Sequence, residues 1–268
     1  EKAEEPKKVM VIGGGVAGLS AAFIAKERGH EVTLYEAGDV LGGNMRLAAY
    51  PPGKGDITNM IRSYIHRCQK DGVKIVMNCE VTPELIKEEK PDSVIIATGS
   101  KTLILPIEGI DNPAIIHGSD LLDGKRPAGK KVLVVGGGMV GCETAAFLGE
   151  QEHDVTVIEF RDTVGADVIH EHRVYLMKDF EDYGIKEITG AKVCKFYEDG
   201  VEYETADGVR HESRGYDSVI LSMGFRNYNP LEEKIKDLVP ETHVIGDAIR
   251  ARRALDATKE AYEVASRL

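Results

Sequence analysis

One short stretch near the start of the chain, residues 8–18, leaves few choices for the fold. It reads KVMVIGGGVAG, an apolar run that breaks into the spacing Gly-x-Gly-x-x-Gly before a helical pattern. The run predicts a buried strand that turns directly into a helix. Gly13 permits the tight turn, Gly15 lets the backbone approach a pyrophosphate, and Gly18 lets the helix pack close to the strand. The stretch therefore predicts a cradle for a dinucleotide.

The residues that follow supply the acid that such a cradle needs. Residues 30–36, HEVTLYE, predict a second strand that ends at Glu36, 18 positions after Gly18. A carboxylate at this distance is placed to meet a ribose hydroxyl. Because strand, glycines, helix and distal acid occur together, they predict a dinucleotide site and not an isolated glycine-rich turn.

The same pattern occurs a second time. Residues 131–141 read KVLVVGGGMVG, and Gly136 and Glu159 follow the first glycine and the acid of the first copy by 123 positions each. Two later apolar strands, 92–99 and 217–224, repeat at an offset of 125. Any two buried parallel strands are rich in Val and Ile, but coordinated matches at nearly one offset favour two copies of one βαβ unit.

The repeat sets the expected domain organisation. It predicts an α/β protein with two Rossmann-like, three-layer domains, the second inserted into the first. A chain of 268 residues is long enough for two such cores. We expect residues 1–8 to be a charged linker that follows a preceding segment, 9–106 and 225–268 to form the first domain, and 107–224 to form the second.

Composition excludes several classes of function. The net charge is −11 with no basic stripe, which argues against a nucleic-acid partner or an anionic membrane surface. No apolar run approaches a membrane span and no signal peptide begins the chain, so we expect a cytoplasmic protein. The four cysteines are scattered, which predicts buried thiols. His170 and His172 near Asp167 fit a solvated helix, so no metal site is expected.

Several loops and turns between the repeats add candidates. Gly42 and Gly43 bring backbone close to a ligand, with an ordinary surface turn as the alternative. Small residues at 97–99 permit close packing, and the backbone near Val81 can touch an adenine. Asp56 is predicted to cap a helix.

Two predictions concern the later part of the chain. Residues 198–210 predict a β-hairpin or a meander that turns at Asp207-Gly208. Residues 241–248 predict a short strand that ends in Gly-Asp, before a final helix that opens at 252–257.

This order of motifs resembles the two-dinucleotide-binding flavoproteins, in which an NAD(P)H domain interrupts an FAD domain. The resemblance covers nearly the whole chain. It implies that the glycines of the first motif, Gly13, Gly15 and Gly18, cradle the FAD pyrophosphate. It also implies that Glu36 binds the adenosine ribose and that Asp247 binds the ribityl chain. It also implies that Gly136, Gly138, Gly141 and Glu159 hold NAD(P)H.

A narrower resemblance rests on residues 41–48 with 52–54, and on 244–248 with 252–254. These segments are similar to the C-terminal part of the iron–sulfur relatives of old yellow enzyme, the 2,4-dienoyl-CoA reductase, 2-enoate reductase and trimethylamine dehydrogenase group. In that group an FMN barrel with a 4Fe–4S cluster precedes this part. The resemblance implies that this chain is the electron-input half, whose partner is an FMN/4Fe–4S barrel domain or subunit, with a homo-oligomer as a further option.

Motifs and resemblance together give two sets of candidate cofactor-binding residues. The set for FAD is Gly13, Gly14, Gly15, Val16, Ala17, Gly18, Glu36, Ala37, Gly42, Gly43, Asn44, Arg46, Val81, Ala97, Thr98, Gly99, Gly246, Asp247, Arg253 and Ala254. The set for NAD(P)H is Gly136, Gly138, Met139, Val140, Gly141, Glu143, Glu159, Met223 and Gly224. No catalytic side chain is assigned, because the cofactors carry the chemistry.

The expected reaction is hydride transfer from NADH to N5 of FAD, with electrons passed to an external acceptor. Glu143 is either near the nicotinamide or a helix-surface acid. Glu159 favours NADH because its carboxylate repels a 2′-phosphate, although Arg161 could pair with one. Two alternatives stay open: a non-catalytic module that holds ADP in place of FAD, as in the trimethylamine dehydrogenase branch, and a free-standing diaphorase.

Overall fold

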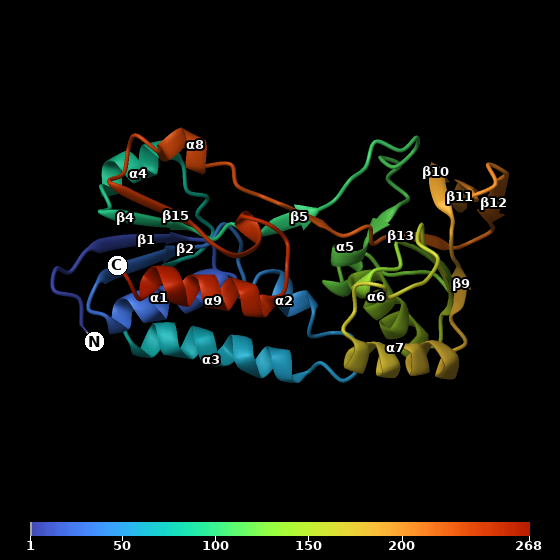
Figure 1. Ribbon diagram of the computed structural model, residues 1–268, viewed down its shortest axis with the longest axis horizontal. Helices are drawn as coiled ribbons and strands as arrows, with labels where there is room; N and C mark the ends of the chain where they lie inside the picture. Colours follow the sequence, from blue (N-terminus) through green and yellow to red (C-terminus); the bar gives the residue numbers. More distant parts are fainter. Residues whose placement is uncertain (1) are drawn as a thin grey trace. The chain divides into compact units, whose positions relative to one another are not determined.

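The computed structural model describes residues 2–268 and divides the chain into two compact units (Figure 1). Unit 1 comprises the residues up to Ala49 together with Gly55–Lys101 and Phe225–Leu268. Unit 2 comprises Tyr50–Lys54 and Thr102–Gly224. The expected boundary lay after residue 106, and the loop 50–54, whose Lys54 pairs with Glu143, belongs to unit 2.

Unit 1 is built on a five-stranded parallel sheet in the order β15-β4-β1-β2-β3. Its strands are β1 (Lys8–Ile12), β2 (Glu31–Tyr35), β3 (Lys74–Val76), β4 (Ser93–Ile96) and β15 (Glu241–Val244). The helices are α1 (Val16–Glu27), α2 (Asn44–Leu47), α3 (Asp56–Lys70), α4 (Pro83–Glu89), α8 (Glu232–Ile235) and α9 (Ala254–Ala265), with a 3-10 turn at Gly246–Ala248.

Alternate residues of β1 build two cores on opposite faces of this sheet. Val9 and Val11 pack with side chains of α1, α3 and α9. Met10 and Ile12 pack on the other face with side chains of α4 and α8. Figure 1 shows these two helical layers on either side of the strands. A strand buried on both faces needs the continuous apolar run that the sequence has there.

Unit 2 repeats the parallel sheet in the order β6-β13-β7-β8-β9. Its strands are β6 (Ile116–His117), β7 (Lys131–Val135), β8 (Asp154–Ile158), β9 (Lys186–Ile188) and β13 (Ser218–Leu221), and its helices are α5 (Gly118–Leu122), α6 (Met139–Glu150) and α7 (His170–Asp182). Val132 and Val134 of β7 pack against α6 and α7. The two parallel sheets confirm the predicted α/β class.

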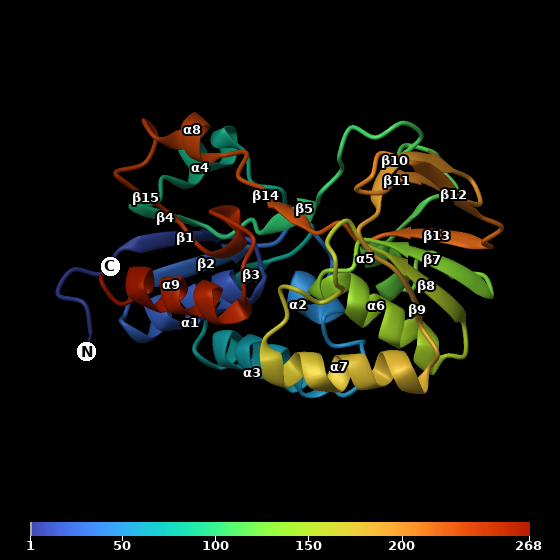
Figure 2. The same ribbon diagram turned by 45° about the vertical axis from the view of Figure 1, so that its right-hand side comes forward.

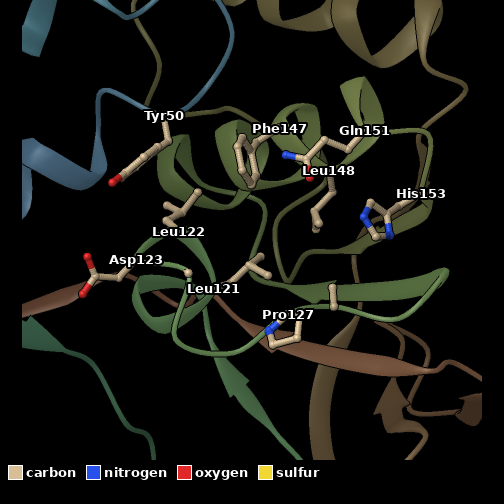
Figure 3. Close-up of a pocket in the computed structure, with 11 residues that line it drawn as sticks. Tyr50, Leu121, Leu122, Asp123, Pro127, Phe147, Leu148, Gln151 and His153 are labelled. Atoms are coloured by element: carbon tan, nitrogen blue, oxygen red, sulfur yellow. The ribbon is translucent and has the colours of Figure 1, made fainter.

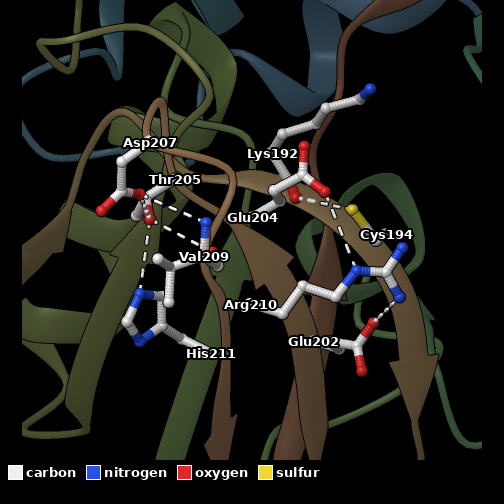
Figure 4. A network of polar contacts seen from close by, with 9 residues as sticks. All are labelled: Lys192, Cys194, Glu202, Glu204, Thr205, Asp207, Val209, Arg210 and His211. Atoms are coloured by element: carbon white, nitrogen blue, oxygen red, sulfur yellow. Dashed lines mark hydrogen bonds and ion pairs between the residues drawn. The ribbon is translucent and has the colours of Figure 1, made fainter.

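The opposite face of the unit 2 sheet is covered by a second sheet and not by helices (Figure 2). This antiparallel layer consists of β10 (Lys192–Tyr197), β11 (Gly200–Glu204) and β12 (Arg210–Arg214). Leu133 and Val135 pack against its Phe196 and Val201. Its outer surface carries a polar network in which the Arg210 guanidinium donates to Glu202 at 2.8 Å (Figure 4).

The predicted hairpin turn at Asp207-Gly208 is confirmed. Gly208 has φ +80°, and the amide of Thr205 donates to the carbonyl of Val209 at 3.0 Å. The Thr205 hydroxyl donates to the Asp207 carboxylate at 2.6 Å and is the main reason that the pKa of Asp207 lies below its usual value. The turn therefore carries its own polar support at the end of β11 (Figure 4).

One predicted helix start is wrong in detail. α3 begins at Asp56, but its N-cap is Gly55 and no side chain caps it, so Asp56 lies in the first helical turn.

The chain leaves and re-enters unit 1 through the paired strands β5 (Ser100–Thr102) and β14 (Phe225–Asn227). No helix in residues 2–268 has the length and apolar character to cross a membrane.

Candidate functional site

The three glycines of the first cradle each meet a different steric demand. Gly13 has φ +107°, and a Cβ there would lie 2.3 Å from the carbonyl oxygen of Ala97. A Cβ on Gly18 would lie 1.9 Å from the carbonyl oxygen of Gly13. A Cβ on Gly15 would meet nothing within 4 Å. Gly13 and Gly18 are therefore required by the fold, whereas Gly15 leaves open space at the N-terminus of α1.

Glu36 lies beside this turn and is held by the backbone. Its carboxylate accepts one hydrogen bond from the amide of Gly14 and one from the amide of Gly38, both at 2.7 Å. Two amides fix the direction of the side chain, and each oxygen keeps a lone pair for a further donor. This is the geometry that a ribose diol would use.

The Gly42–Gly43 loop packs on the cradle and is not an ordinary surface turn. The amide of Gly42 donates to the carbonyl of Gly14 at 2.8 Å, and a Cβ on Gly43 would lie 3.1 Å from Cα of Gly15. Asn44 follows directly and its side-chain amide donates to the Ser100 hydroxyl at 3.2 Å. The loop therefore forms one wall of the open space above Gly15.

Other predicted residues gather at the carboxyl ends of the unit 1 strands. The Asp247 carboxylate accepts from the Ser100 hydroxyl at 2.9 Å and from the amide of Arg252 at 3.1 Å. Arg253 is the N-cap residue of α9, and its amide donates to the Asp256 carboxylate at 3.3 Å. Val81 is 5% exposed within the core, so only its backbone could meet a ligand.

The second cradle reproduces the first in detail. A Cβ on Gly136 would lie 2.4 Å from the carbonyl oxygen of Ser222, and one on Gly141 would lie 1.8 Å from that of Gly136. The Glu159 carboxylate accepts from the amides of Gly137 at 2.6 Å and Arg161 at 2.9 Å. A cavity of about 320 Å³ opens here. Its lining includes the predicted residues Gly136, Gly138, Met139, Val140, Glu159, Met223 and Gly224, together with Arg161, Asp167 and Ser222.

Glu143, the fifth residue of α6 and two positions after Gly141, is not a helix-surface acid. Its side chain is 7% exposed, and its carboxylate forms an ion pair with Lys54 and lies 3.2 Å from Nε2 of His172. A buried carboxylate is stabilised only when it is paired and hydrogen-bonded. Lys54 and His172 were not predicted as partners, because each comes from a segment distant in the sequence.

Asp167 makes a contact at the N-terminus of α6 that its sequence pattern did not predict. Its carboxylate accepts a hydrogen bond from the amide of Met139, the first residue of α6, at 2.9 Å. No hydrogen bond joins His170 to Asp167 in the described residues. No three metal-ligating side chains come together in residues 2–268. The repeat itself held the signal for this contact, since Asp167 follows Asn44 by the same 123 positions.

The cysteines of the described chain are all free thiols. Cys68 and Cys142 are fully buried, and burial raises the pKa of the Cys68 thiol to about 11 and that of Cys142 to about 12. A thiol with a raised pKa is a poor nucleophile at neutral pH. These residues therefore do not form a redox-active pair beside either cradle.

Unit 2 has another hollow, of about 380 Å³, away from the motif glycines (Figure 3). Leu121 and Leu122 of α5 and Phe147 and Leu148 of α6 supply its apolar lining. His153 at its edge has its Nδ1 2.7 Å from the carbonyl oxygen of Gly129. None of these groups has the anion-binding geometry of the cradles.

Comparison with known proteins agrees with the two cradles. Residues 7–245 match the family described as pyridine nucleotide-disulphide oxidoreductase. The chain belongs to this family. Its members bind FAD and NAD(P)H, so this chain is an oxidoreductase module for these two cofactors. The family confirms the predicted fold class and cofactors.

Closer relatives support the narrower resemblance. The chain is 34% identical over 271 residues to the cinnamate reductase of Clostridium sporogenes, and the match covers 100% of this chain and 40% of that protein. It is 34% identical to the NADH oxidase of Thermoanaerobacter brockii, over 99% of this chain and 41% of that protein. A solved 2-naphthoyl-CoA reductase superposes with a TM-score of 0.95 at 32% identity, over 100% of this chain and 41% of the other.

More distant structures show the fold alone. The thioredoxin reductase of T. acidophilum matches with a TM-score of 0.73 at 19% identity, over 98% of this chain and 97% of that protein. The chain therefore spans about two fifths of the cinnamate reductase and of the NADH oxidase, and nearly all of the thioredoxin reductase. The reductases carry additional parts beyond this module.

Proposed function

We propose that unit 1 holds FAD, that unit 2 holds NADH, and that the chain feeds electrons to a partner domain. The observation that carries the proposal is the duplicated cradle with its fixed acid. In each unit a carboxylate, Glu36 or Glu159, accepts two backbone amides beside an open glycine turn. One such site binds one dinucleotide, and two sites suit a donor and an acceptor of hydride.

Each residue has a defined task in this proposal. The amides around Gly15 and Gly138 meet the pyrophosphates at the N-termini of α1 and α6. Glu36 and Glu159 accept hydrogen bonds from the ribose hydroxyls, and Asp247 accepts one from a hydroxyl of the ribityl chain. When bound, NADH supplies a hydride that FAD accepts and passes on as electrons.

The acid of unit 2 sets the preference between NADH and NADPH. Glu159 is held in place by two amides, so its negative charge cannot swing away from the ribose. A 2′-phosphate there would meet like charge at close range, which disfavours NADPH. Arg161 is part of the same wall, and its amide supports Glu159.

The relatives suggest the acceptor. Because the reductases that match this chain are about two and a half times longer, we propose an FMN barrel with an iron–sulfur cluster, in the same polypeptide or a separate subunit, as the partner. The names cinnamate reductase and 2-naphthoyl-CoA reductase favour an enoate or enoyl-type final substrate. We place the protein in the cytoplasm.

An absorption spectrum of the purified chain tests the proposal. We expect flavin bands near roughly 450 nm that bleach on anaerobic addition of NADH, and more slowly with NADPH. A colourless protein that releases only ADP, and that gains no NADH-reducible absorbance when FAD is supplied, would instead establish a non-catalytic nucleotide-binding module. A flavin that NADH reduces and that only dyes or oxygen can reoxidise, even with the barrel present, would favour a free-standing diaphorase.

A further inference from the structure

The second cradle holds a carboxylate at the place where a dinucleotide pyrophosphate would bind. Asp167 accepts a hydrogen bond from the amide of Met139, the first residue of the 12-residue helix α6. A Cβ built on Gly138 would lie 3.3 Å and 3.5 Å from its two oxygens. The space that glycine keeps open at this helix N-terminus is therefore bordered by a negative charge from the chain itself.

The first cradle lacks this feature although the surrounding loop is the same. The amide of Gly42 donates to Gly14 at 2.8 Å, and the amide of Gly165 donates to Gly137 at 2.7 Å, 123 positions later in both cases. Two residues further on, the first loop has the neutral Asn44, which donates to Ser100. The second loop has Asp167 at that position, so the two cradles differ in charge at this corresponding site.

Core packing fixes the position of the loop backbone that carries Asp167. Val164 is 0% exposed and Val168 is 8% exposed, and both belong to the core between β7 and α6. These anchors hold the loop on each side, and Gly165, with φ +63°, makes its turn. Asp167 itself is exposed, so its side chain can rotate into water without disturbing that core.

We propose that Asp167 is a built-in competitor of the NADH pyrophosphate at the N-terminus of α6, and that NADH binds by displacing it. The inference rests on the proposed function of unit 2. The free amides and the dipole of a helix N-terminus stabilise an anion, and a carboxylate and a phosphate cannot both use the same N–H. Their like charges also repel each other.

The competition lowers the affinity of unit 2 for every dinucleotide that carries this pyrophosphate. It acts on NADH and on NAD⁺ alike, because the pyrophosphate is common to both. Asp167 therefore weakens the equilibrium binding of the oxidised and the reduced nucleotide alike. The device is local to unit 2 and leaves the FAD cradle unaffected.

Equilibrium binding to the FAD-loaded chain tests this inference. Isothermal titration calorimetry with ADP-ribose, and with NAD⁺, both of which carry the pyrophosphate but cannot reduce the oxidised flavin, would give Kd for wild type and for Asp167→Asn. We expect the variant to bind both ligands roughly three- to tenfold more tightly, the range that helix-terminal charges produce. Asp167→Ala should tighten binding at least as much, because it also frees the amide of Met139.

Asp162→Asn is the matched control, since it removes one exposed charge from the same segment away from α6. It should leave Kd within a factor of about two of wild type. Equal Kd values for wild type and both Asp167 variants, with binding intact, would overturn the inference and leave the proposed function standing. Absence of binding in wild type and variants alike, with FAD retained, would overturn both. Binding by the variants alone would support the inference in its strongest form.

Discussion

The two units share a motif and a sheet, but they use the surrounding residues differently. The hydrogen bond from the amide of Gly14 to Glu36 in unit 1 has its counterpart 123 positions later in unit 2, from Gly137 to Glu159. The differences lie just beside the motif. Unit 1 has Ser20 and Asn44 where unit 2 has Glu143 and Asp167. The glycine pattern thus sets the backbone, and the neighbouring side chains set the charge.

The other difference concerns the far face of each sheet. Helices α4 and α8 cover it in unit 1, whereas the antiparallel layer β10–β12 covers it in unit 2. The cradles lie at the strand ends and do not depend on which layer is present. One dinucleotide-binding frame therefore tolerates two solutions to the burial of its second face.

Replacement of the close-packed glycines should produce the largest effect. Gly18→Ala and Gly141→Ala would each place a methyl group within 2 Å of a carbonyl oxygen, and we expect a loss of about 3 kcal/mol in the free energy of unfolding. Alanine would ordinarily stabilise a helix relative to glycine, so the sign of the change is diagnostic. Urea unfolding followed by circular dichroism measures it.

Gly15 of the first cradle supplies the matched control. Gly15→Ala adds a methyl group where nothing lies within 4 Å, so its unfolding free energy should stay within about 0.5 kcal/mol of wild type. Similar losses for Gly15→Ala and Gly18→Ala would show that close approach of strand and helix is not what the motif requires.

The repeat made much of this architecture predictable. Glycine spacing is dictated by backbone geometry that any βαβ cradle must satisfy, so one motif and its copy placed both turns, both acids and both parallel sheets. The Gly42–Gly43 loop followed from the same reasoning. The offset, carried on past Glu159, would also have matched Asp167 to Asn44 and drawn attention to its charge.

The partners of Glu143 could not be read from local pattern. Lys54 comes from a loop 89 positions earlier and His172 from a helix 29 positions later, and only the fold brings them to one carboxylate. A glutamate on a helix is usually solvated, so burial at 5% exposure reverses the ordinary expectation. Asp56 failed as a cap for a simpler reason, because helix starts are uncertain by a residue or two.

Removal of Lys54 should have the next largest effect. Lys54→Met leaves the buried Glu143 carboxylate with His172 alone, and we expect a loss of about 2 kcal/mol in the free energy of unfolding. The position in unit 1 that corresponds to Glu143 is Ser20, which is neutral and needs no buried cation beside it. Urea unfolding of the variant at pH 7.5 would measure the loss.

A double-mutant cycle isolates the pair. In the Glu143→Gln background the buried charge is gone, so Lys54→Met should cost well under 1 kcal/mol there. Lys54→Arg, which keeps the cation, is the conservative control. If Lys54→Met cost the same with and without the Glu143 carboxylate, the lysine would act through packing and not through charge.

The smallest predicted effect is the pH dependence that the buried Cys142 thiol gives to the free energy of unfolding. Burial raises the pKa of Cys142 to about 12, whereas a thiol in the unfolded chain ionises near its ordinary value of 9. Between these values unfolding releases a proton, so the stability that the protonated thiol contributes is complete below pH 9 and is lost as the pH rises. Between pH 8 and 9.5 wild type should lose about 1 kcal/mol more than Cys142→Ala.

Alkylation of the thiols compares Cys68 of unit 1 with Cys142 of unit 2. Its thiol donates to the carbonyl of Leu19 at 3.4 Å, and that of Cys142 donates to Gly137 at 3.2 Å, so each unit buries one thiol against its own cradle helix or turn. Both should resist alkylation in the folded protein at pH 8, while the half-buried Cys79 and Cys194 react first. Rapid labelling of Cys142 without unfolding would mean that α6 opens locally, and the second cradle would then be the more mobile of the two.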